Sequence, residues 1–390
     1  MITPEEALAR VFALVQPLST EDVPLEYAAG RVLRHAVTAG RDQPPFAASA
    51  MDGYGVTADA QPGDRLRVTG QAAAGHAFPG GISTGEAVRI FTGAPVPAGV
   101  ARVVLQEDIA RDGDLITLPE SLGKSTHIRA QAVDFKTGDT ITAPRRLSPV
   151  ALALLAAMNC PNVTVSRRPD VAIIATGDEL VMPGETPRAD QIIASNAFAI
   201  KALAEAEGAQ ARILPIAADT ETSLRSVFEL AAGADMIVTI GGASVGDHDL
   251  VGPVVDALGT KRSFYKIAMR PGKPLMAGKL KGAVLLGLPG NPVSSIVCAH
   301  LFMRPALRAM QGLGQWPMPS ATAALGCDLP ANGPRTHYIR AALSPGPTIT
   351  PMDNQDSSLL TMLASADALL VHPAGGGPRK AGEQMRYIPL

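Results

Sequence analysis

The sequence predicts a multidomain protein of the α/β plus β class, with a doubly wound α/β subdomain, a small β-rich subdomain and a C-terminal β-domain. Three observations lead to this prediction. The chain has 390 residues, enough for two to four domains. Apolar runs of strand length alternate with helical patterns from 169 to 314. Short alternating segments separated by Gly and Pro fill much of the chain on either side of that region.

The chain begins with a predicted helix that ends near Pro17. Thr3 is placed to act as its N-cap, Pro4 takes the first helical position, and Glu6 completes a capping box. Apolar residues then recur at helical spacing, which gives the helix one face suited to a core.

Residues 1–40 and 135–168 are predicted to form a helical linking subdomain, with a second helix over 149–158. The segment between them, 41–134, is predicted to be the small β-rich subdomain. Its Asp-Gly-Asp step at 112–114 is a strong signal for a β-hairpin turn.

The α/β subdomain, 169–314, contains continuous apolar runs, which are typical of parallel strands covered on both faces. The sequence therefore predicts a parallel sheet with strands at 171–175, 212–216, 236–240 and 283–288. The accompanying helices are expected over 196–208, after Asp219, and from Asn291 to Met310. A stiff Trp-Pro-Met-Pro linker at 316–319 follows, within the predicted C-terminal β-domain at 315–390.

Composition excludes several classes of function. A net charge of −2 with 18% charged residues is not that of a chain-wide basic surface, so no nucleic-acid partner is expected. The longest nearly apolar stretch, 150–158, is too short to span a bilayer, and the N-terminus has no secretory signal pattern. Cys160, Cys298 and Cys327 lie far apart with no CxxC pair. Buried thiols in a reducing compartment are therefore expected, and the predicted location is cytoplasmic.

Ligands of open α/β sheets bind outside the carboxyl ends of the strands, and unusual loops follow several predicted strands here. Thr176, Gly177, Asp178 and Glu179 follow the first strand. Adjacent carboxylates could hold a hard cation such as Mg²⁺. A strand-end turn with solvated acids explains the same residues.

A Gly-rich loop follows the strand at 236–240 and contains Gly241, Gly242, Ser244 and Gly246. Such glycines allow backbone N–H groups to form a concave anion-binding nest. The loop matches neither the dinucleotide-binding nor the P-loop pattern. Its acids, including Asp249, could equally be helix caps.

Two further loops carry charge or a helix start. Lys266, Arg270 and Lys273 lie within eight residues, a suitable clamp for phosphate or another oxyanion, although a solvated basic turn is the alternative. The Pro-Gly-Asn-Pro step at 289–292 defines a helix N-terminus, which attracts anions but is also ordinary capping. Together the loops favour an anionic ligand with a bridging Mg²⁺.

Six motifs in order give the chain a specific resemblance. They are Ser-Ala-Met-Asp-Gly-Tyr at 49–54, Thr-Gly-Ala-Pro-Val-Pro at 92–97, Thr-Gly-Asp-Glu-Leu at 176–180, Gly-Gly-Ala-Ser-Val-Gly at 241–246, Arg-Pro-Gly-Lys-Pro at 270–274 and Leu-Pro-Gly-Asn-Pro at 288–292. This set resembles the molybdopterin molybdenumtransferase family, which includes MoeA and the E domain of gephyrin. The resemblance extends over nearly the whole chain.

The resemblance implies four subdomains and an elongated homodimer, in which the cleft lies between the molybdopterin-binding α/β subdomain of one copy and the β-rich subdomain of the other. The implied reaction inserts molybdenum from molybdate into adenylylated molybdopterin, releases AMP and depends on Mg²⁺. The implied partners are the upstream molybdopterin adenylyltransferase and downstream molybdoenzymes. Two alternatives to this function remain: the chain is a molybdopterin adenylyltransferase, or it is a non-catalytic scaffold of the same fold.

The motif positions imply roles for individual residues. The implied catalytic residues are Asp52, Thr92, Glu179, Asp219, Asp249, Lys266, Arg270 and Lys273. The implied cofactor-binding residues are Thr176, Gly177, Gly241, Gly242, Ser244, Gly246, Pro289, Asn291, Pro292 and Ser294. Glu179 and Asp249 are the implied metal ligands, with Asp52 and Asp134 as further candidates.

The sequence departs from the family pattern at several places. Ala47 and Ala48 replace a frequent Asp-Asn pair, and Ala194 replaces a common Asp. The usual glycine before Asp134 is missing, and Arg270 replaces a frequent Lys while keeping the charge.

Overall fold

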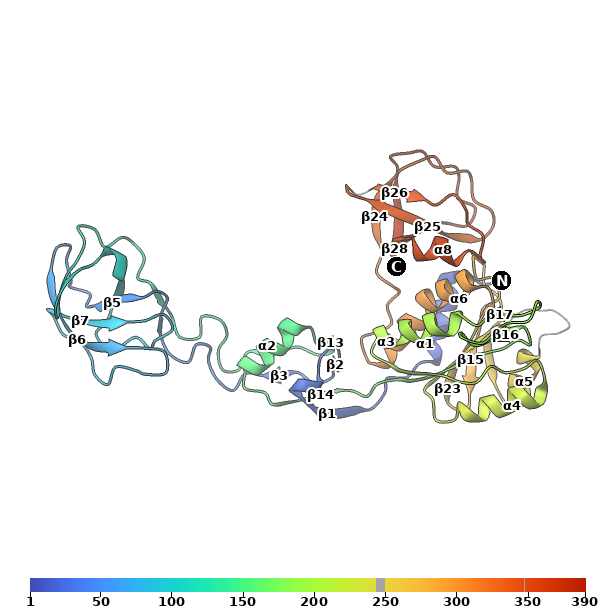
Figure 1. The fold of residues 1–390 in the computed structure, drawn as a ribbon, viewed down its shortest axis with the longest axis horizontal. Coiled ribbons are helices and arrows are strands. Elements are labelled where there is room, and N and C mark those ends of the chain that lie inside the picture. The colour runs from blue at the N-terminus through green and yellow to red at the C-terminus, as the bar shows by residue number, and fades with distance from the viewer. Residues whose placement is uncertain (243–249, 347) are drawn as a thin grey trace.

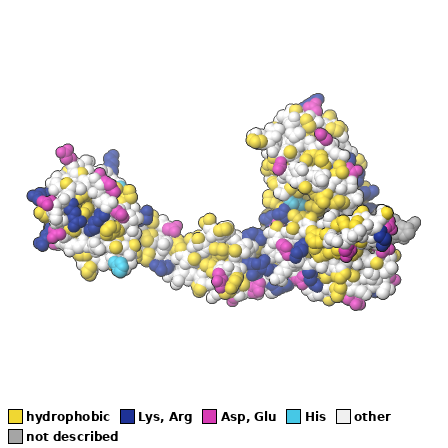
Figure 2. Space-filling model, in the orientation of Figure 1, with side chains coloured by type: hydrophobic (Ala, Val, Ile, Leu, Met, Phe, Trp, Pro, Cys, Tyr) yellow, Lys and Arg dark blue, Asp and Glu magenta, His cyan; other side chains and the backbone are white. Residues whose placement is uncertain are grey.

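A computed structural model describes residues 1–242, 250–346 and 348–390. The molecule is elongated (Figure 1). The β-rich subdomain lies at one end, a slender linking subdomain follows, and the α/β subdomain and the C-terminal domain lie together at the other end. Charged side chains of both signs are spread over the visible face (Figure 2). No helix among the described residues is both long and apolar enough to cross a membrane.

The linking subdomain is built from short strands and one helix around its own apolar core. Its main sheet has the order β1-β14-β2-β13, with strands Thr20–Pro24, Asn162–Ser166, Val32–Leu33 and Arg145–Arg146. A second ladder pairs β3 (Val37–Thr38) with β12 (Thr140–Ile141), and α2 covers the core at Pro149–Ala157. The predicted helix over 149–158 is thus confirmed, with Ser148 as its N-cap.

The β-rich subdomain contains a six-stranded sheet of order β8-β5-β7-β6-β10-β9. In chain order these strands are Gly53–Val56 (β5), Arg65–Ala72 (β6), Glu86–Ile90 (β7), Arg102–Leu105 (β8), Ala110–Asp112 (β9) and Leu115–Thr117 (β10). A separate pair joins β4 (Ala48–Ser49) to β11 (Ile128–Arg129). The predicted hairpin turn at 112–114 is confirmed, since β9 and β10 pair around a Gly113 with φ of 61°.

The sheet of the α/β subdomain has the order β18-β15-β19-β23-β22-β20. Its strands are Asp170–Ala175 (β15), Gln210–Ile213 (β18), Met236–Ile240 (β19), Lys261–Phe264 (β20), Met276–Leu280 (β22) and Ala283–Leu288 (β23). The first four strands in that order are parallel, as predicted. However, β22 and β20 are antiparallel, because a two-residue turn at Lys281 and Gly282, both with positive φ, folds β22 directly onto β23.

Helices cover both faces of this sheet, so its doubly wound character is confirmed. One face packs against α1 (Pro4–Leu14), α3 (Asn196–Ala206), α6 (Pro292–Cys298) and α7 (Arg304–Met310). The other packs against α4 (Glu221–Leu230) and α5 (Val251–Ala257). A small ladder, β16 (Leu180–Val181) with β17 (Ile192–Ile193), flanks the sheet.

Two helices differ in detail from the sequence prediction. The α1 helix has the expected Thr3 cap, but its apolar face packs into the α/β core and not into the linking subdomain with which it was grouped. The predicted long helix from Asn291 to Met310 is present, with a π-helical turn at Ala299–Met303. Pro305 explains the turn, because it has no N–H to donate and its ring crowds the preceding turn.

In the C-terminal domain, five strands close on themselves in the order β25-β26-β24-β28-β27, since β25 also pairs with β27. The strands are Ala321–Leu325 (β24), Thr336–Ser344 (β25), Thr348–Pro351 (β26), Ala368–His372 (β27) and Gln384–Pro389 (β28), with α8 at Leu360–Ala364. A sixth strand, β21 (Met269–Arg270), comes from the α/β region and pairs with β25. This pairing ties the two domains together.

Candidate functional site

A pocket of about 740 Å³ opens at the carboxyl ends of β15, β19 and β23. The sequence predicted a site at this edge of the sheet. Its lining includes ten of the residues that the motifs singled out: Thr176, Gly177, Glu179, Asp219, Gly241, Gly242, Pro289, Asn291, Pro292 and Ser294. Three strand ends therefore bring together loops that are separated by more than 100 residues.

Gly241 and Gly242, the first two residues after β19, occupy positions that a larger side chain would not fit. Gly242 has φ of 60°, and a Cβ there would lie 2.1 Å from Cγ2 of Val251 in α5. Gly241 has φ of 96°, and a Cβ there would lie 2.7 Å from the carbonyl oxygen of Thr176. The Gly241 amide donates to the Leu288 carbonyl. These glycines thus allow close packing of three strand ends, and the Gly241 N–H is not available to a nest. Ser244, Gly246 and Asp249 lie outside the described residues.

The two acids after β15 have different surroundings. Asp178 accepts a hydrogen bond from the backbone N–H of Asp219 at 3.0 Å, which joins the two loops. Glu179 borders the pocket. A Cβ at Gly177 would lie 2.4 Å from Oε2 of Glu179, so glycine is what lets this carboxylate fold back over the turn. Asp219 lies just before α4, whose N-cap is Thr220.

The C-terminal domain supplies part of the pocket wall. Asn291 of the α6 N-terminus donates from Nδ2 to Oγ of Ser357 at 3.0 Å, and the next residue, Ser358, borders the pocket. Arg340, which is 2% exposed, donates to the Asp356 and Asn354 carbonyls and so fixes this segment. The sequence analysis missed Ser358, because nothing in the local pattern of a distant β-domain indicates that it reaches this pocket.

The predicted cations lie outside the described lining of the pocket. Arg270 belongs to β21 and pairs in register with His337 of the C-terminal domain. Lys273 accepts at its carbonyl from the Ile267 amide, and its neighbour Pro274 borders the pocket. Nζ of Lys266 lies 5.6 Å from the ring centroid of Tyr265. Arg270 and Lys273 are exposed.

Asp52 and Thr92 form a separate unit in the β-rich subdomain. The Thr92 amide and its hydroxyl both donate to Oδ1 of Asp52 at 2.7 Å. These bonds, first the amide and then the hydroxyl, lower the pKa of Asp52, and the positive charge of Arg89 adds to the effect. Within one chain, this unit lies at the opposite end of the molecule from the pocket (Figure 1). Asp134 is exposed, in the connection between the β-rich and linking subdomains, where its amide donates to the Gln43 carbonyl.

Three family models match consecutive parts of the chain. Residues 2–159 match the MoeA N-terminal region (domain I and II), 172–309 match a probable molybdopterin binding domain, and 322–390 match the MoeA C-terminal region (domain IV). A curated molybdopterin molybdenumtransferase from Haemophilus influenzae is 36% identical over 83% of this chain and 81% of its own length. The chain belongs to the molybdopterin molybdenumtransferase family. Its relatives are transferases of molybdenum cofactor biosynthesis.

Further comparisons agree with this membership. The molybdopterin molybdenumtransferase of a Nostoc species is 34% identical over 97% of the chain and 92% of its own length. A crystal structure of the molybdopterin biosynthesis MoeA protein from Pyrococcus horikoshii matches this chain with a TM-score of 0.85 at 25% identity. The match covers the whole of both chains. The predicted fold class is thereby confirmed over the full length.

A divalent cation such as Mg²⁺ prefers oxygen ligands. The pocket at the carboxyl ends of β15, β19 and β23 offers two carboxylates, those of Glu179 and Asp219. Across residues 1–242, 250–346 and 348–390, no group of three or more His, Cys, Asp or Glu side chains is arranged to hold a metal. Mg²⁺ commonly binds through one or two carboxylates together with substrate phosphates, so two acids fit in number and in chemistry.

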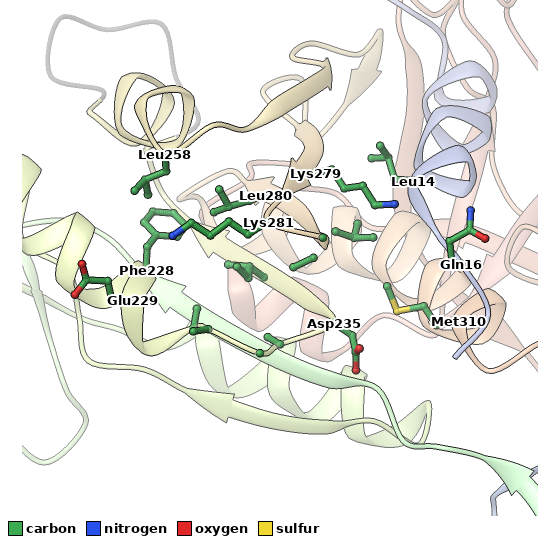
Figure 3. A pocket seen from close by; sticks show the side chains of 18 of the residues that line it. Leu14, Gln16, Phe228, Glu229, Asp235, Leu258, Lys279, Leu280, Lys281 and Met310 are labelled. Atoms are coloured by element: carbon green, nitrogen blue, oxygen red, sulfur yellow. The ribbon is translucent and has the colours of Figure 1, made fainter. Parts of the chain in front are cut away.

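A second pocket, of about 440 Å³, lies at the amino ends of β19 and β23 (Figure 3). Its lining is largely apolar, with Leu14, Phe228 and Leu280 among the contributors and Lys279 and Lys281 alongside. None of the family motif residues is among its described lining. The motif residues therefore make the pocket at the carboxyl ends the candidate site.

Proposed function

We propose that this family member inserts molybdenum from molybdate into adenylylated molybdopterin, with release of AMP and with dependence on Mg²⁺. The observation that carries the proposal is the pocket at the carboxyl ends of β15, β19 and β23. Four of the six family motifs contribute to its lining, in a chain related to molybdenumtransferases over 97% of its length. A pocket of about 740 Å³ is of the size that encloses a small organic ligand.

Each part of the pocket has a role in this reaction. The exposed cations Arg270 and Lys273 attract molybdate and the substrate phosphates to the mouth. Glu179 and Asp219 provide the carboxylates that would hold Mg²⁺ beside those phosphates. The ion would supply positive charge that offsets the negative charge of the phosphate oxygens. The sulfur ligands of molybdenum belong to the substrate, so no cysteine is required from the chain.

We propose that Asp52 and Thr92 complete the site from a second copy of the chain. Two observations support this. The pair belongs to the family motifs, yet it lies at the far end of the same chain from the pocket. Its geometry is also already set, because Thr92 donates twice to the Asp52 carboxylate. The proposal extends to handover of substrate from a molybdopterin adenylyltransferase and of product to molybdoenzymes.

The test is a single-turnover assay on the purified full chain with adenylylated molybdopterin, molybdate and Mg²⁺. AMP release and molybdenum incorporation are the two signals measured. Glu179→Gln should abolish both signals. Glu229→Gln, an acid beside the second pocket, should leave them unchanged. Formation of adenylylated molybdopterin and pyrophosphate from free molybdopterin and ATP would instead indicate an adenylyltransferase. Absence of both activities would indicate a scaffold.

The shared cleft has its own test. Asp52→Asn and Glu179→Gln proteins, each inactive alone, are co-expressed with different tags and the mixed species is purified. If the cleft is shared between copies, the mixed dimer has one intact cleft and recovers about half of the activity per dimer. If both residues serve a cleft within one chain, the mixture stays inactive.

A further inference from the structure

We infer that Arg89 is a positioning residue that holds Asp52 and Thr92 in their working geometry. The inference rests on the proposed role of Asp52 and extends it to a residue outside the six motifs. Arg89 lies in β7, directly opposite Tyr54 of β5. The Asp52 loop enters β5, and Thr92 follows the end of β7. The guanidinium is thus placed between the two strand ends that carry the pair.

Hydrogen bonds from Arg89 reach the backbone beside Asp52. Nη1 donates to the Gly53 carbonyl at 2.9 Å, and Nη2 donates to the side-chain oxygen of Gln106. The backbone N–H of Gln106 in turn donates to the backbone carbonyl of Asp52 at 3.2 Å. The successive peptides of Asp52 and Gly53 are therefore held, directly or through one residue, by the same guanidinium.

Aromatic contacts extend the same support to the Thr92 side. The guanidinium carbon of Arg89 lies 5.0 Å from the ring centroid of Tyr54 and 4.7 Å from that of Phe91. Both distances are within the range of cation–π attraction. Tyr54 follows Gly53 and Phe91 precedes Thr92, so one planar cation contacts the chain on both sides of the Asp52–Thr92 bonds.

The chemistry of this position requires arginine. A lysine carries the charge, but its single ammonium cannot donate in two fixed directions and stack between two rings. The Arg89 charge also favours an ionised Asp52, the form that accepts both bonds from Thr92. Arg89 hence acts on Asp52 both through geometry and through charge.

The experiment compares Arg89→Met, Arg89→Lys and Arg65→Met in the AMP-release assay of the full chain. Arg65 is an exposed arginine of β6 and serves as the matched control. Arg89→Met should lower kcat by about 10- to 100-fold, the range expected when catalytic groups are misplaced by an ångström or less. KM should change less than kcat. Arg89→Lys should be intermediate, and Arg65→Met should match the unmodified protein. A fourth variant, Arg89→Ala, leaves space for a free guanidinium ion. Guanidinium at a non-denaturing concentration should partly restore the kcat of that variant.

Asp52→Asn, alone and combined with Arg89→Met, separates the possible outcomes. Normal activity of Asp52→Asn would refute the proposed role of Asp52, and the inference with it. Low activity of Asp52→Asn with normal kcat for Arg89→Met would overturn the inference alone. The inference is also overturned if Arg89→Met lowers kcat by the same factor in the unmodified protein and in Asp52→Asn. A residue that acts through Asp52 must lose its effect when Asp52 is replaced. If Arg89→Met fails to fold, a normal kcat for Arg89→Lys overturns the inference, because lysine keeps the charge and loses the two fixed donors.

Discussion

Replacement of Gly53 by alanine should break the contact between β5 and β8 and disturb Asp52 next to it. A Cβ on Gly53 would lie 2.0 Å from the Val104 carbonyl oxygen, a separation that real side chains do not adopt. The obstacle is backbone, so the strands must move apart by about 1 Å or more. At this point Gly53 pairs with Leu105 and Tyr54 pairs with Val104.

The cost follows from what that movement breaks. Two weakened ladder hydrogen bonds contribute about 1 kcal/mol each. Overpacking against a buried strand adds about 1 kcal/mol or more. The local free energy of opening should thus fall by about 3 kcal/mol, which corresponds to roughly 100-fold faster amide exchange. Activity should fall as well, because Asp52 immediately precedes the displaced peptide.

Hydrogen exchange measured by mass spectrometry is the suitable assay, since unfolding of a chain with several subdomains is not a single two-state transition. Peptides covering β5 and β8 should exchange faster, and peptides covering β19 should not change. Gly40→Ala is the control, because a Cβ at Gly40 meets open space. Unchanged exchange in β5 and β8 of Gly53→Ala would refute the steric argument.

Three further predictions concern the other end of the molecule. His300 is buried, and burial followed by the nearby Arg304 cation lowers its pKa to about 4. The unfolded chain therefore binds the proton between pH 6.5 and 4, so the local free energy of opening around His300 falls by up to about 3 kcal/mol as pH falls through that window. His300→Gln should flatten this loss, measured as hydrogen exchange of peptides covering 299–310 at pH 7 and pH 5 and corrected for the intrinsic exchange rate. Gly242→Ala, with its Cβ 2.1 Å from Val251 and φ of 60°, should lower molybdopterin affinity measured by calorimetry. Gly333→Ala should not, because Gly333 has no left-handed φ and its Cβ would meet open space. Asn291→Ala removes the 3.0 Å bond to Ser357 and should speed exchange in 353–358 by about fivefold, without change in β19.

The sequence predicted those features that depend on local patterns. The hairpin at 112–114 and the helix at 149–158 follow from turn and capping residues, which act over a few positions. The pocket residues were found because parallel strands direct their following loops to one edge. Strand β22 was not predicted, because a short strand with a central glycine and lysine gives only a weak strand pattern.

Other features were not predictable because they depend on contacts between distant segments. The α1 helix has an ordinary amphipathic pattern, which does not specify which core it covers. Ser358 reaches the pocket through a closed barrel that begins more than 30 residues earlier, and Arg89 shows its role only when Tyr54 and Phe91 are brought to its two sides. Composition cannot report such convergence.

The two halves of the proposed site are each organised within their own subdomain. Asp52 is fixed by Thr92 and Gln106 inside the β-rich subdomain, and the pocket is formed by strand ends of the α/β subdomain. Each half also has its own apolar core, so we expect the two halves to fold independently. Bringing the halves together thus demands placement of preformed surfaces and no local refolding, which limits the entropic cost of assembly. A substitution in one half should leave the local structure of the other unchanged, and that independence is what makes complementation between two inactive copies a decisive test.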